Sequence, residues 1–465
     1  MRAVMKFGGH CVEDGTMIRR SCSIVKKYVE DGWQVVAVVS AMAGVTDGLL
    51  EALTRAEAGD SRFIEDFVNK LRGQHLKAAE LAIVDEELRR AVVDEVERKL
   101  NEMERALLVM CQLKEVSPRG RDYVLSFGER LSARIFTGSL LDMGVRAKYL
   151  TGWEAGIITD DRFGAANPIK PLTYEQIRER LGALLAKGVT PVVTGFIAST
   201  ADGVITTLGR GGSDLTATII GGALKVDEIV LWKDVEGVMT ADPKLVPEAR
   251  VVPVMSYEEV TELAYFGAKV IHPLALDPAA EAGVPIRVKG IFNPLAQGTL
   301  ITKDSGVEGV VKAVTMVKDV ATINVSSTRM LEAPAMTIEI LKALNEVGAR
   351  PLMISQGSSQ ASTSLVIPRG LLDKAVRSIR RRLADESYRI EAEDDVCIVA
   401  VIGAGMRGRP GVAARVFKAV ADEGVNVRMI AQGSSELNIS FVVKAADGVR
   451  ALRALHREFG LHGNL

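Results

Sequence analysis

The sequence predicts an α/β fold, with a mainly parallel sheet between helices followed by two smaller α/β domains. Strand-like and helical stretches alternate up to about residue 300, as in chains whose parallel strands are covered by helices on both faces. Beyond the segment GTLIT at 298–302 the chain repeats itself. LMISQGSS from Leu352 aligns without a gap on RMIAQGSS from Arg428, an offset of 76 residues (428 − 352).

The individual elements follow from apolar periodicity and from turn residues. A strand-like run at 4–7 precedes a helical stretch at 17–29, and a second strand follows at 34–39. Further helices are predicted at 126–143 and 174–187. Three later stretches read as one buried strand (TPVVTGFI), a hairpin (GVITTLGRGG) and another strand (DEIVLWKDV).

Residues 61–112 form a highly charged insertion that is predicted to contain two surface helices without chemistry. The helical spacing on which this rests is that of Leu81, Val84, Leu88, Val92, Val96 and Leu100.

Composition and charge exclude several function classes. The chain has 465 residues, enough for about three domains, with 58 basic and 59 acidic residues and a net charge of -1. This balance gives no reason to expect nucleic acid or an anionic membrane as a partner. No apolar run approaches the ~20 residues of a membrane span, and Lys6 with two glycines interrupts any secretory leader, so we expect a cytoplasmic protein. The four cysteines and five histidines show no metal-binding spacing, so no transition-metal site is expected.

The run VMKFGG at 4–9 suits a polyphosphate. Gly8 and Gly9 let backbone N–H groups approach oxygen atoms, and Lys6 can neutralise charge as a phosphoryl group moves. The alternative is a solvated lysine at a strand end, which is common when nothing else supports a site.

Support comes from TLGRGGSDLTA at 207–217, a glycine-rich turn that leads into a helix. A helix N-terminus attracts anions, the planar fork of Arg210 matches a carboxylate, and Asp214 can anchor a lysine or an ammonium group. The alternative is an ordinary hairpin turn in which Asp214 caps the helix.

Two further stretches carry polar residues at places where open α/β sheets bind ligands. SAMAGVTDG at 40–48 brings Ser40 and Thr46 to the carboxyl end of the second strand. FGERLSA places Glu129 in the first turn of a helix. For Glu129 the alternative is compensation of the helix dipole, with a surface pair to Arg130 or Arg134.

Taken together, the chain resembles the aspartate kinase family over almost its whole length, and closely its single-function type. The resemblance rests on KFGG (6–9), TLGRGGSD (207–214) and FGAKVIHP (266–273) in combination, and the repeat is similar to the tandem ACT domains of that family. It implies an amino acid kinase fold over 1–304, followed by ACT domains of βαββαβ type at 305–385 and 386–465. The implied reaction is ATP-dependent phosphorylation of L-aspartate to 4-phospho-L-aspartate, the first step to lysine, threonine and methionine.

The resemblance also implies roles for particular residues. Lys6, Gly8 and Gly9 would hold the transferring phosphoryl group, and Asp214 would orient Lys6. Arg210 would bind the substrate α-carboxylate, with Ser40, Thr46 and Glu129 holding the rest of the amino acid. The nucleotide would lie against Lys233, Asp234, Lys244 and Lys269, with Mg²⁺ bound mainly by phosphates and water rather than by a protein metal site.

The ACT repeats imply an amino-acid effector, threonine or lysine, and a homodimer or higher homo-oligomer. Residues of the two QGSS segments and one neighbour are the effector candidates: Gln356, Ser358, Gln432, Ser434 and Glu436. The alternative role of these segments is strand pairing across a dimer.

The sequence departs from the family pattern at several positions near the predicted site. His10 and Cys11 replace the usual Thr-Ser, Asp47 replaces Asn, and Lys233, Met239 and Lys244 replace Thr, Tyr and Arg. A protonated His10 can donate to a phosphate oxygen with Asp47 as its partner, or the changes are tolerated drift. The alternative functions are a catalytically weak regulatory paralogue or amino-acid sensor, and a kinase for another small carboxylate.

Overall fold

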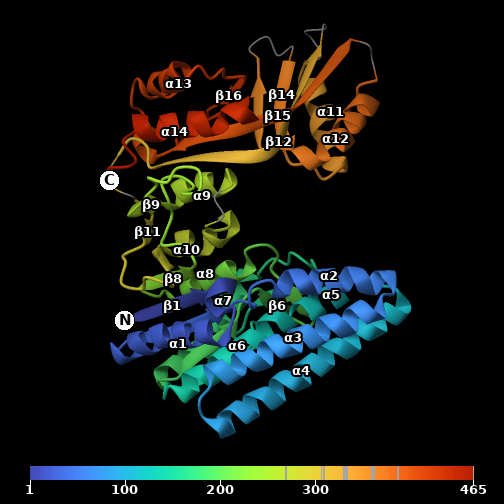
Figure 1. The fold of residues 1–465 in the computed structure, drawn as a ribbon, viewed down its shortest axis with the longest axis vertical. Helices are drawn as coiled ribbons and strands as arrows, with labels where there is room; N and C mark the ends of the chain where they lie inside the picture. Colours follow the sequence, from blue (N-terminus) through green and yellow to red (C-terminus); the bar gives the residue numbers. More distant parts are fainter. Residues whose placement is uncertain are drawn as a thin grey trace. The chain divides into compact units, whose positions relative to one another are not determined.

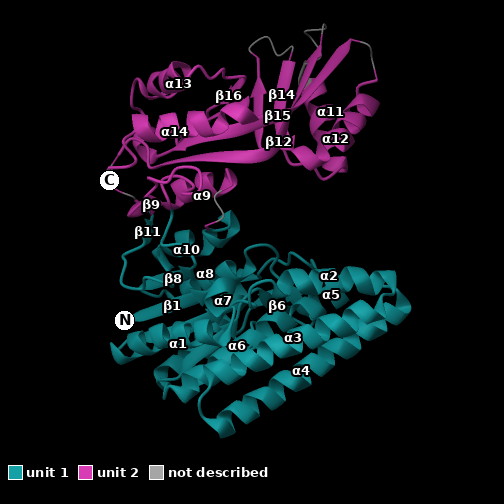
Figure 2. Cartoon of the chain, in the orientation of Figure 1, with its two compact units in different colours: residues 1–238, 271–303 teal, residues 239–270, 304–465 magenta. Residues whose placement is uncertain are grey.

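The computed structural model describes residues 1–267, 270–304, 306, 309–327, 333–357, 362–384 and 387–463, without the side chains of 333 and 334. The chain forms two compact units, drawn in separate colours in Figure 2. The first contains Met1–Val238 and Ile271–Lys303, and the second contains Met239–Val270 and Asp304–Leu465. The predicted limits at 304, 385 and 386 stay predictions.

The first unit is built on a sheet whose strands lie in the order β3-β5-β2-β1-β8-β10-β11. All neighbours in this series are parallel except β10 and β11. The bounds are β1 Arg2–Phe7, β2 Gln34–Val39, β3 Ala147–Leu150, β5 Thr190–Thr194, β8 Glu228–Lys233, β10 Ile286–Gly290 and β11 Thr299–Thr302. A small second sheet joins β4 (Ile158–Thr159), β6 (Ile197–Thr200) and β7 (Ile205–Thr207).

Register places the carboxyl ends of three central strands side by side. Phe7 at the end of β1 lies opposite both Val39 of β2 and Trp232 of β8. The residues that follow these strands therefore gather at one edge of the sheet, where ligands bind in open α/β folds.

Helices cover both faces of this sheet (Figure 1). Met5 and Phe7 belong to a core that also contains residues of the helices α1 and α6, whereas Lys6 points to the opposite face, toward α8. The helices are α1 Gly15–Glu30, α2 Val45–Ala58, α3 Ser61–Ala82, α4 Glu86–Leu113, α5 Pro118–Leu125, α6 Phe127–Asp142, α7 Lys170–Ala186, α8 Gly212–Leu224 and α10 Asp277–Ala282.

Most of the predicted elements of this unit are confirmed, and one strand is corrected. The strands predicted at 4–7 and 34–39 and the helix predicted at 17–29 appear as β1, β2 and α1. TPVVTGFI is not one strand but two, β5 and β6, because the chain breaks at Gly195 and Phe196, where Phe196 has a positive φ of 67°. Apolar content alone did not reveal this break.

The insertion contains the two predicted helices, α3 and α4, but the apolar residues on which the prediction rested do not form one buried row. Val92, Val96 and Leu100 are fully buried, whereas Leu81 and Val84 are 46% and 67% exposed. The row fails because α3 ends at Ala82 and α4 begins at Glu86, so a helical spacing cannot continue across the intervening residues.

The second unit contains one antiparallel sheet in the order β13-β14-β12-β15-β17-β16. Its strands are β12 Ala313–Ser327, β13 Met353–Gln356, β14 Ser362–Pro368, β15 Tyr388–Ile402, β16 Met429–Ala431 and β17 Asn438–Lys444. Its helices are α9 Tyr257–Tyr265, α11 Ala333–Glu346, α12 Leu372–Arg382, α13 Val412–Asp422 and α14 Gly448–Glu458, and the short strand β9 (Val254–Ser256) also belongs to it.

The internal repeat is a structural repeat. β14 and β17 begin and end 76 residues apart (438 − 362 and 444 − 368), and so do α12 and α14 (448 − 372 and 458 − 382). Each copy builds its own core, yet both cores draw on the two long strands. Val314 and Val399 belong to one core, whereas Ile323 and Ile390 belong to the other.

Among the described residues, none of the helices has the length and the apolar character that a membrane crossing requires.

Candidate active site

A cavity of about 340 Å³ lies at the carboxyl edge of the first unit's sheet. Its walls come from the end of β1, the segment after β2, the first turn of α6 and the glycine-rich turn before α8. Seven of the residues predicted from the sequence line it: Lys6, Gly9, Ser40, Thr46, Glu129, Arg210 and Asp214. Residues far apart in the sequence thus meet around one small space.

One buried carboxylate pairs with two lysines beside this cavity. Asp214, in the first turn of α8, lies 2.7 Å from Lys6 Nζ through Oδ1 and 3.0 Å from Lys233 Nζ through Oδ2. Burial would raise the pKa of Asp214, but the charges of Lys233 and Lys6 outweigh it and hold that pKa below its ordinary value. Burial also lowers the pKa of Lys233, with the neighbouring Lys6 acting in the same direction. Asp214 therefore stays ionised and fixes both ammonium groups.

The two glycines after β1 differ in what requires them. A Cβ added at Gly9 would lie 3.2 Å from the Ala41 carbonyl oxygen, so the protein itself packs closely there. A Cβ added at Gly8 would meet only ordinary contacts, at 3.5 Å from Lys6 Nζ and from the Trp232 carbonyl oxygen. Packing within the protein therefore explains Gly9, whereas Gly8 leaves space without a side chain beside the lysine, although its own N–H donates to the Trp232 carbonyl at 3.2 Å.

Glu129 occupies the side of the cavity formed by α6. It is 3% exposed, and burial raises its pKa to about 8, although hydrogen bonds from the backbone of Ala41 and from Ser213 and the charge of Lys6 act in the opposite direction. Its Oε2 atom is buried without a hydrogen-bond partner in the described structure. A buried carboxyl with an unused oxygen suits a ligand that brings hydrogen-bond donors or positive charge.

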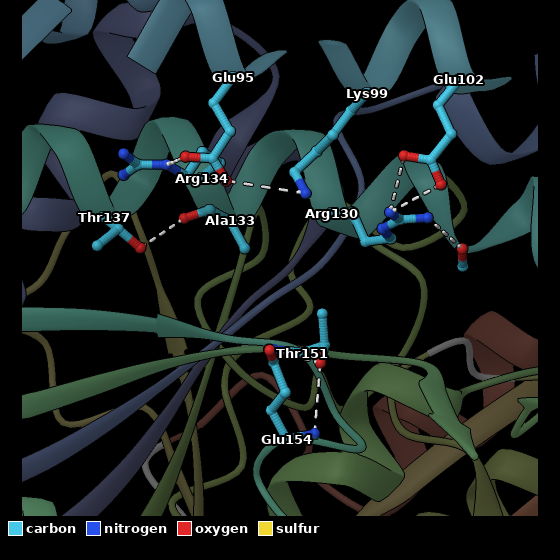
Figure 3. Close-up of polar contacts among 10 residues, drawn as sticks. Glu95, Lys99, Glu102, Arg130, Ala133, Arg134, Thr137, Thr151 and Glu154 are labelled. Atoms are coloured by element: carbon cyan, nitrogen blue, oxygen red, sulfur yellow. Dashed lines mark hydrogen bonds and ion pairs between the residues drawn. The ribbon is translucent and has the colours of Figure 1, made fainter. Parts of the chain in front are cut away.

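The alternative for Glu129, a surface ion pair with Arg130 or Arg134, does not form. Figure 3 shows that Arg130 and Arg134 turn to α4 instead, where Arg130 lies 3.3 Å from Glu102 and Arg134 pairs with Glu95. These ion pairs attach α6 to α4, and Glu129 is left to face the cavity.

The remaining substrate-site candidates are held by backbone geometry. Ser40 follows β2, and its N–H donates to the Phe7 carbonyl at 3.2 Å. Thr46 lies in the first turn of α2. Arg210 is exposed and stands between Gly209 and Gly211, whose φ angles of 74° and 76° require the left-handed conformation that glycine adopts at little cost.

The predicted nucleotide residues are only partly brought together. Lys233 is joined to Lys6 through Asp214, and Asp234 follows it as an exposed residue. Lys244 belongs to the second unit, where it is exposed, and Lys269 lies outside the described residues.

The residues that depart from the family pattern take separate roles. His10 Nδ1 lies 3.0 Å from Glu13 Oε2, so Glu13 rather than Asp47 is its ion-pair partner, and this hydrogen bond raises the pKa of His10. Cys11 is buried with its thiol 3.3 Å from the Trp232 carbonyl oxygen, and burial raises its pKa to about 11. Asp47 lines the cavity from α2.

The cavity wall includes Ser213 and Phe196, which were not predicted as site residues. Ser213 hydrogen-bonds to Glu129, and Phe196 stands where β5 and β6 separate. The sequence GGSD offered a signal for Ser213, since it adjoins Asp214. Nothing in the sequence marked Phe196, whose unusual φ of 67° becomes visible only in the structure.

The effector candidates lie on or beside the edge strands of the second unit's sheet. Gln356 ends β13 and Gln432 follows β16, and both are exposed, as is Ser434. Glu436 has a φ of 53° and accepts a hydrogen bond from the N–H of Gly408. Ser358 lies outside the described residues.

Comparisons with known proteins agree with this architecture. Residues 1–290 match the model of the amino acid kinase family, and residues 323–383 and 399–459 match that of the ACT domain. The chain is 34% identical to aspartokinase 1, chloroplastic, of Arabidopsis thaliana over 99% of its own length and 81% of that relative. The chain belongs to the aspartokinases.

Solved aspartokinases share the fold of the whole chain. E. coli aspartokinase III in complex with aspartate and ADP is 29% identical, with a TM-score of 0.82 over 99% of this chain and all of that one. The aspartate kinase of Clostridium acetobutylicum is 26% identical, with a TM-score of 0.81 over 98% of this chain and all of its own. The predicted family, the amino acid kinase fold with its ACT domains and the class of enzyme, a kinase, are thereby confirmed.

Proposed function

We propose that this aspartokinase transfers the γ-phosphoryl group of ATP to the side-chain carboxylate of L-aspartate, the first step to lysine, threonine and methionine. The observation that carries the proposal is that one cavity is lined by Lys6, Asp214, Glu129 and Arg210 together. E. coli aspartokinase III, which shares the fold, binds aspartate and ADP.

On the nucleotide side, the chain supplies positioned positive charge. Phosphoryl transfer depends mainly on alignment and on neutralising the charge of the phosphate oxygens. Lys6 would contact the transferring group and Lys233 would lie close to the nucleotide, with Asp214 fixing the ammonium groups of both. The absence of a side chain at Gly8 would leave room for phosphate oxygens beside Lys6.

On the amino-acid side, the two ends of the substrate meet opposite charges. Arg210 would form a forked pair with the α-carboxylate, and Glu129, once ionised, would accept hydrogen bonds from the α-ammonium group. Ser40 and Thr46 would complete the contacts. The side-chain carboxylate is itself the nucleophile, so no general base is needed.

Mg²⁺ would support the transfer by neutralising phosphate charge. Within the described ranges no group of three His, Cys, Asp or Glu side chains is arranged to hold a metal ion. Asp214 is committed to two lysines, so the ion would be bound by phosphate oxygens and water.

The second unit would bind an amino-acid effector and join two copies of the chain. E. coli aspartokinase III has been solved with lysine, and the ACT matches here make feedback by lysine or threonine the natural proposal. The edge strands β13 and β16 carry Ile354 and Ile430, equivalent in the repeat and 44% and 46% exposed. Exposed apolar side chains on edge strands favour pairing with a second copy.

The proposal is tested by an ATP-dependent hydroxamate assay over a panel of small carboxylates, with Lys6→Ala as the site variant. Lys6→Ala should lower kcat at least about a hundredfold, because the charge that stabilises the moving phosphoryl group is lost. Lys187→Ala, at an exposed helix end, is the matched control and should keep wild-type activity.

Three results would contradict the proposal. Near wild-type turnover in Lys6→Ala would remove the phosphate role of this lysine, and faster turnover of another carboxylate than of aspartate would favour the alternative substrate class. No turnover of any carboxylate by the wild-type chain would favour the regulatory paralogue.

A further inference from the structure

A second cavity, of about 770 Å³, lies within the second unit and takes no part in the proposed reaction. One wall is the segment 246–250, and the other is the last turns of α14 with the residues that follow it. This volume falls in the range of small-molecule sites in proteins, roughly 300–1,000 Å³. The cavity is therefore large enough for a metabolite rather than for a single ion.

Positive charge reaches this cavity from both walls. Arg250 lines it from the segment side, and Arg453 and Arg457, four residues apart on one face of α14, line it from the helix side. Glu423 partly neutralises Arg457 at 2.5 Å. The Nε atom of Arg453 donates to the Leu245 carbonyl at 2.9 Å, which fixes the side chain. The two terminal nitrogens of its guanidinium group take no part in that bond.

Two histidines also line the cavity, and one of them is buried. His456 is 2% exposed, with Nε2 3.1 Å from Thr240 Oγ1, and His462 stands 6.4 Å away between ring centroids. Burial and the neighbouring His462 lower the pKa of His456, while Glu248 acts in the opposite direction. An anion in the cavity would favour protonation of the His456 ring.

Thr240 connects the residues around the cavity to the sheet of the second unit. Thr240 Oγ1, besides its contact with His456, accepts a hydrogen bond from the N–H of Arg250 at 3.0 Å. The Thr240 carbonyl accepts from the N–H of Val314 in β12 at 2.8 Å. Both walls are therefore held by one buried threonine that is itself bonded to β12, which gives the site a fixed geometry.

We propose that this cavity is a binding site for a small phosphorylated anion. Guanidinium forks match the oxygens of phosphate groups, and three lining arginines against two carboxylates, Glu248 of the lining and Glu423 paired with Arg457, call for an anionic ligand. A free amino acid such as lysine or threonine carries no net negative charge, so this site differs in chemistry from the proposed effector site.

The test uses inorganic pyrophosphate as the probe and the full chain as the protein. Hydrogen exchange, read segment by segment, should slow at 245–250 and 448–463 when pyrophosphate is added. Calorimetry should then show that Arg453→Gln weakens this binding by at least about tenfold, because a charge-assisted hydrogen bond is lost while the stem of the side chain is kept. His462→Gln, at an exposed position of the lining, is the second variant, and its binding of pyrophosphate should be weaker than that of wild type.

Controls separate this cavity from the kinase site and from general charge effects. Arg450→Gln changes an arginine of the same helix that pairs with Asp447 and does not line the cavity, and it should bind like wild type. Lys6→Ala should leave protection of 448–463 unchanged. The proposal is overturned if pyrophosphate does not protect these segments, if Arg450→Gln weakens binding as much as Arg453→Gln, or if citrate binds there as tightly as pyrophosphate.

Discussion

At the scale of single residues, two buried carboxyls of the candidate active site have pKa values shifted in opposite directions. Asp214 has two lysines within 3.0 Å and a lowered pKa, whereas Glu129 has no such pair and its burial raises its pKa to about 8. Groups whose environments separate their pKa values in this way usually have different tasks. Here Asp214 stays ionised near neutral pH, whereas Glu129 must lose its proton before it can pair with a cation.

Glu129 predicts a pH dependence of aspartate binding. Below pH 8 its carboxyl holds a proton, and accepting the substrate ammonium group requires that proton to leave. The KM for aspartate should therefore rise as pH falls below 8, by up to about tenfold per pH unit. Steady-state kinetics between pH 6 and 9 measures this directly.

The matched variant is Glu129→Gln, which keeps the size of the side chain and removes its titration. Its KM for aspartate should be high and nearly constant below pH 8, while the KM for ATP should differ little from wild type. A wild-type KM for aspartate that is equal at pH 6 and pH 8 would rule out this role for Glu129.

Some features of the site could be predicted at this scale and others could not. Lys6, Arg210 and Asp214 stand in motifs whose chemistry is local, so the sequence pointed to them. The sequence suggested Asp47 as the partner of His10, whereas the structure pairs His10 with Glu13, three residues away. Side-chain pairing depends on the turn of η1 (Gly9–Val12), which periodicity does not reveal.

At the scale of elements, the contact between α1 and α3 depends on a glycine. A Cβ added at Gly15 would lie 2.2 Å from the Ala78 carbonyl oxygen and 2.6 Å from Leu81 Cβ. Gly15→Ala should therefore force α1 and α3 apart and lower the free energy of unfolding by about 1–3 kcal/mol. Urea denaturation followed by circular dichroism measures the change.

Gly73→Ala in the middle of α3 is the control for this prediction. Nothing lies within 4 Å of a Cβ added there, so the change should be neutral or stabilise by up to about 1 kcal/mol through helix propensity. Equal destabilisation by both variants would show that helix contact at Gly15 is not the cause.

The sequence predicted elements best where a local pattern continued without interruption. β2 appears with the predicted bounds, and the offset of 76 residues found in the sequence also relates α12 to α14. The division of TPVVTGFI and the loss of Leu81 and Val84 from the apolar row both occur at chain breaks. Such breaks depend on tertiary contacts, so apolar spacing cannot locate them.

At the scale of the whole molecule, the second unit is discontinuous in sequence. Residues 239–270 belong with 304–465, and their contacts include a buried ion pair. Glu259 is 0% exposed and lies 3.4 Å from Lys312, and it also accepts a hydrogen bond from the N–H of Ala404 at 2.6 Å. Ala241 and Val246 pack in the same core as residues of α14.

This arrangement predicts that a chain ending at Thr302 is destabilised as well as unregulated. It would keep residues 239–270 but lose Lys312 and Ala404, leaving the carboxylate of Glu259 without two of its partners and the apolar residues of that segment without their core. Removing one partner of a buried ion pair alone costs about 3–5 kcal/mol.

The melting temperature of the truncated chain should fall, and lysine or threonine should no longer raise it. In the full chain, by contrast, an effector that binds the folded state should raise it. Scanning calorimetry of both chains with each amino acid checks this. A truncated chain as stable as the full one, or one that still responds to the effector, would mean that the second unit neither completes segment 239–270 nor holds the effector site.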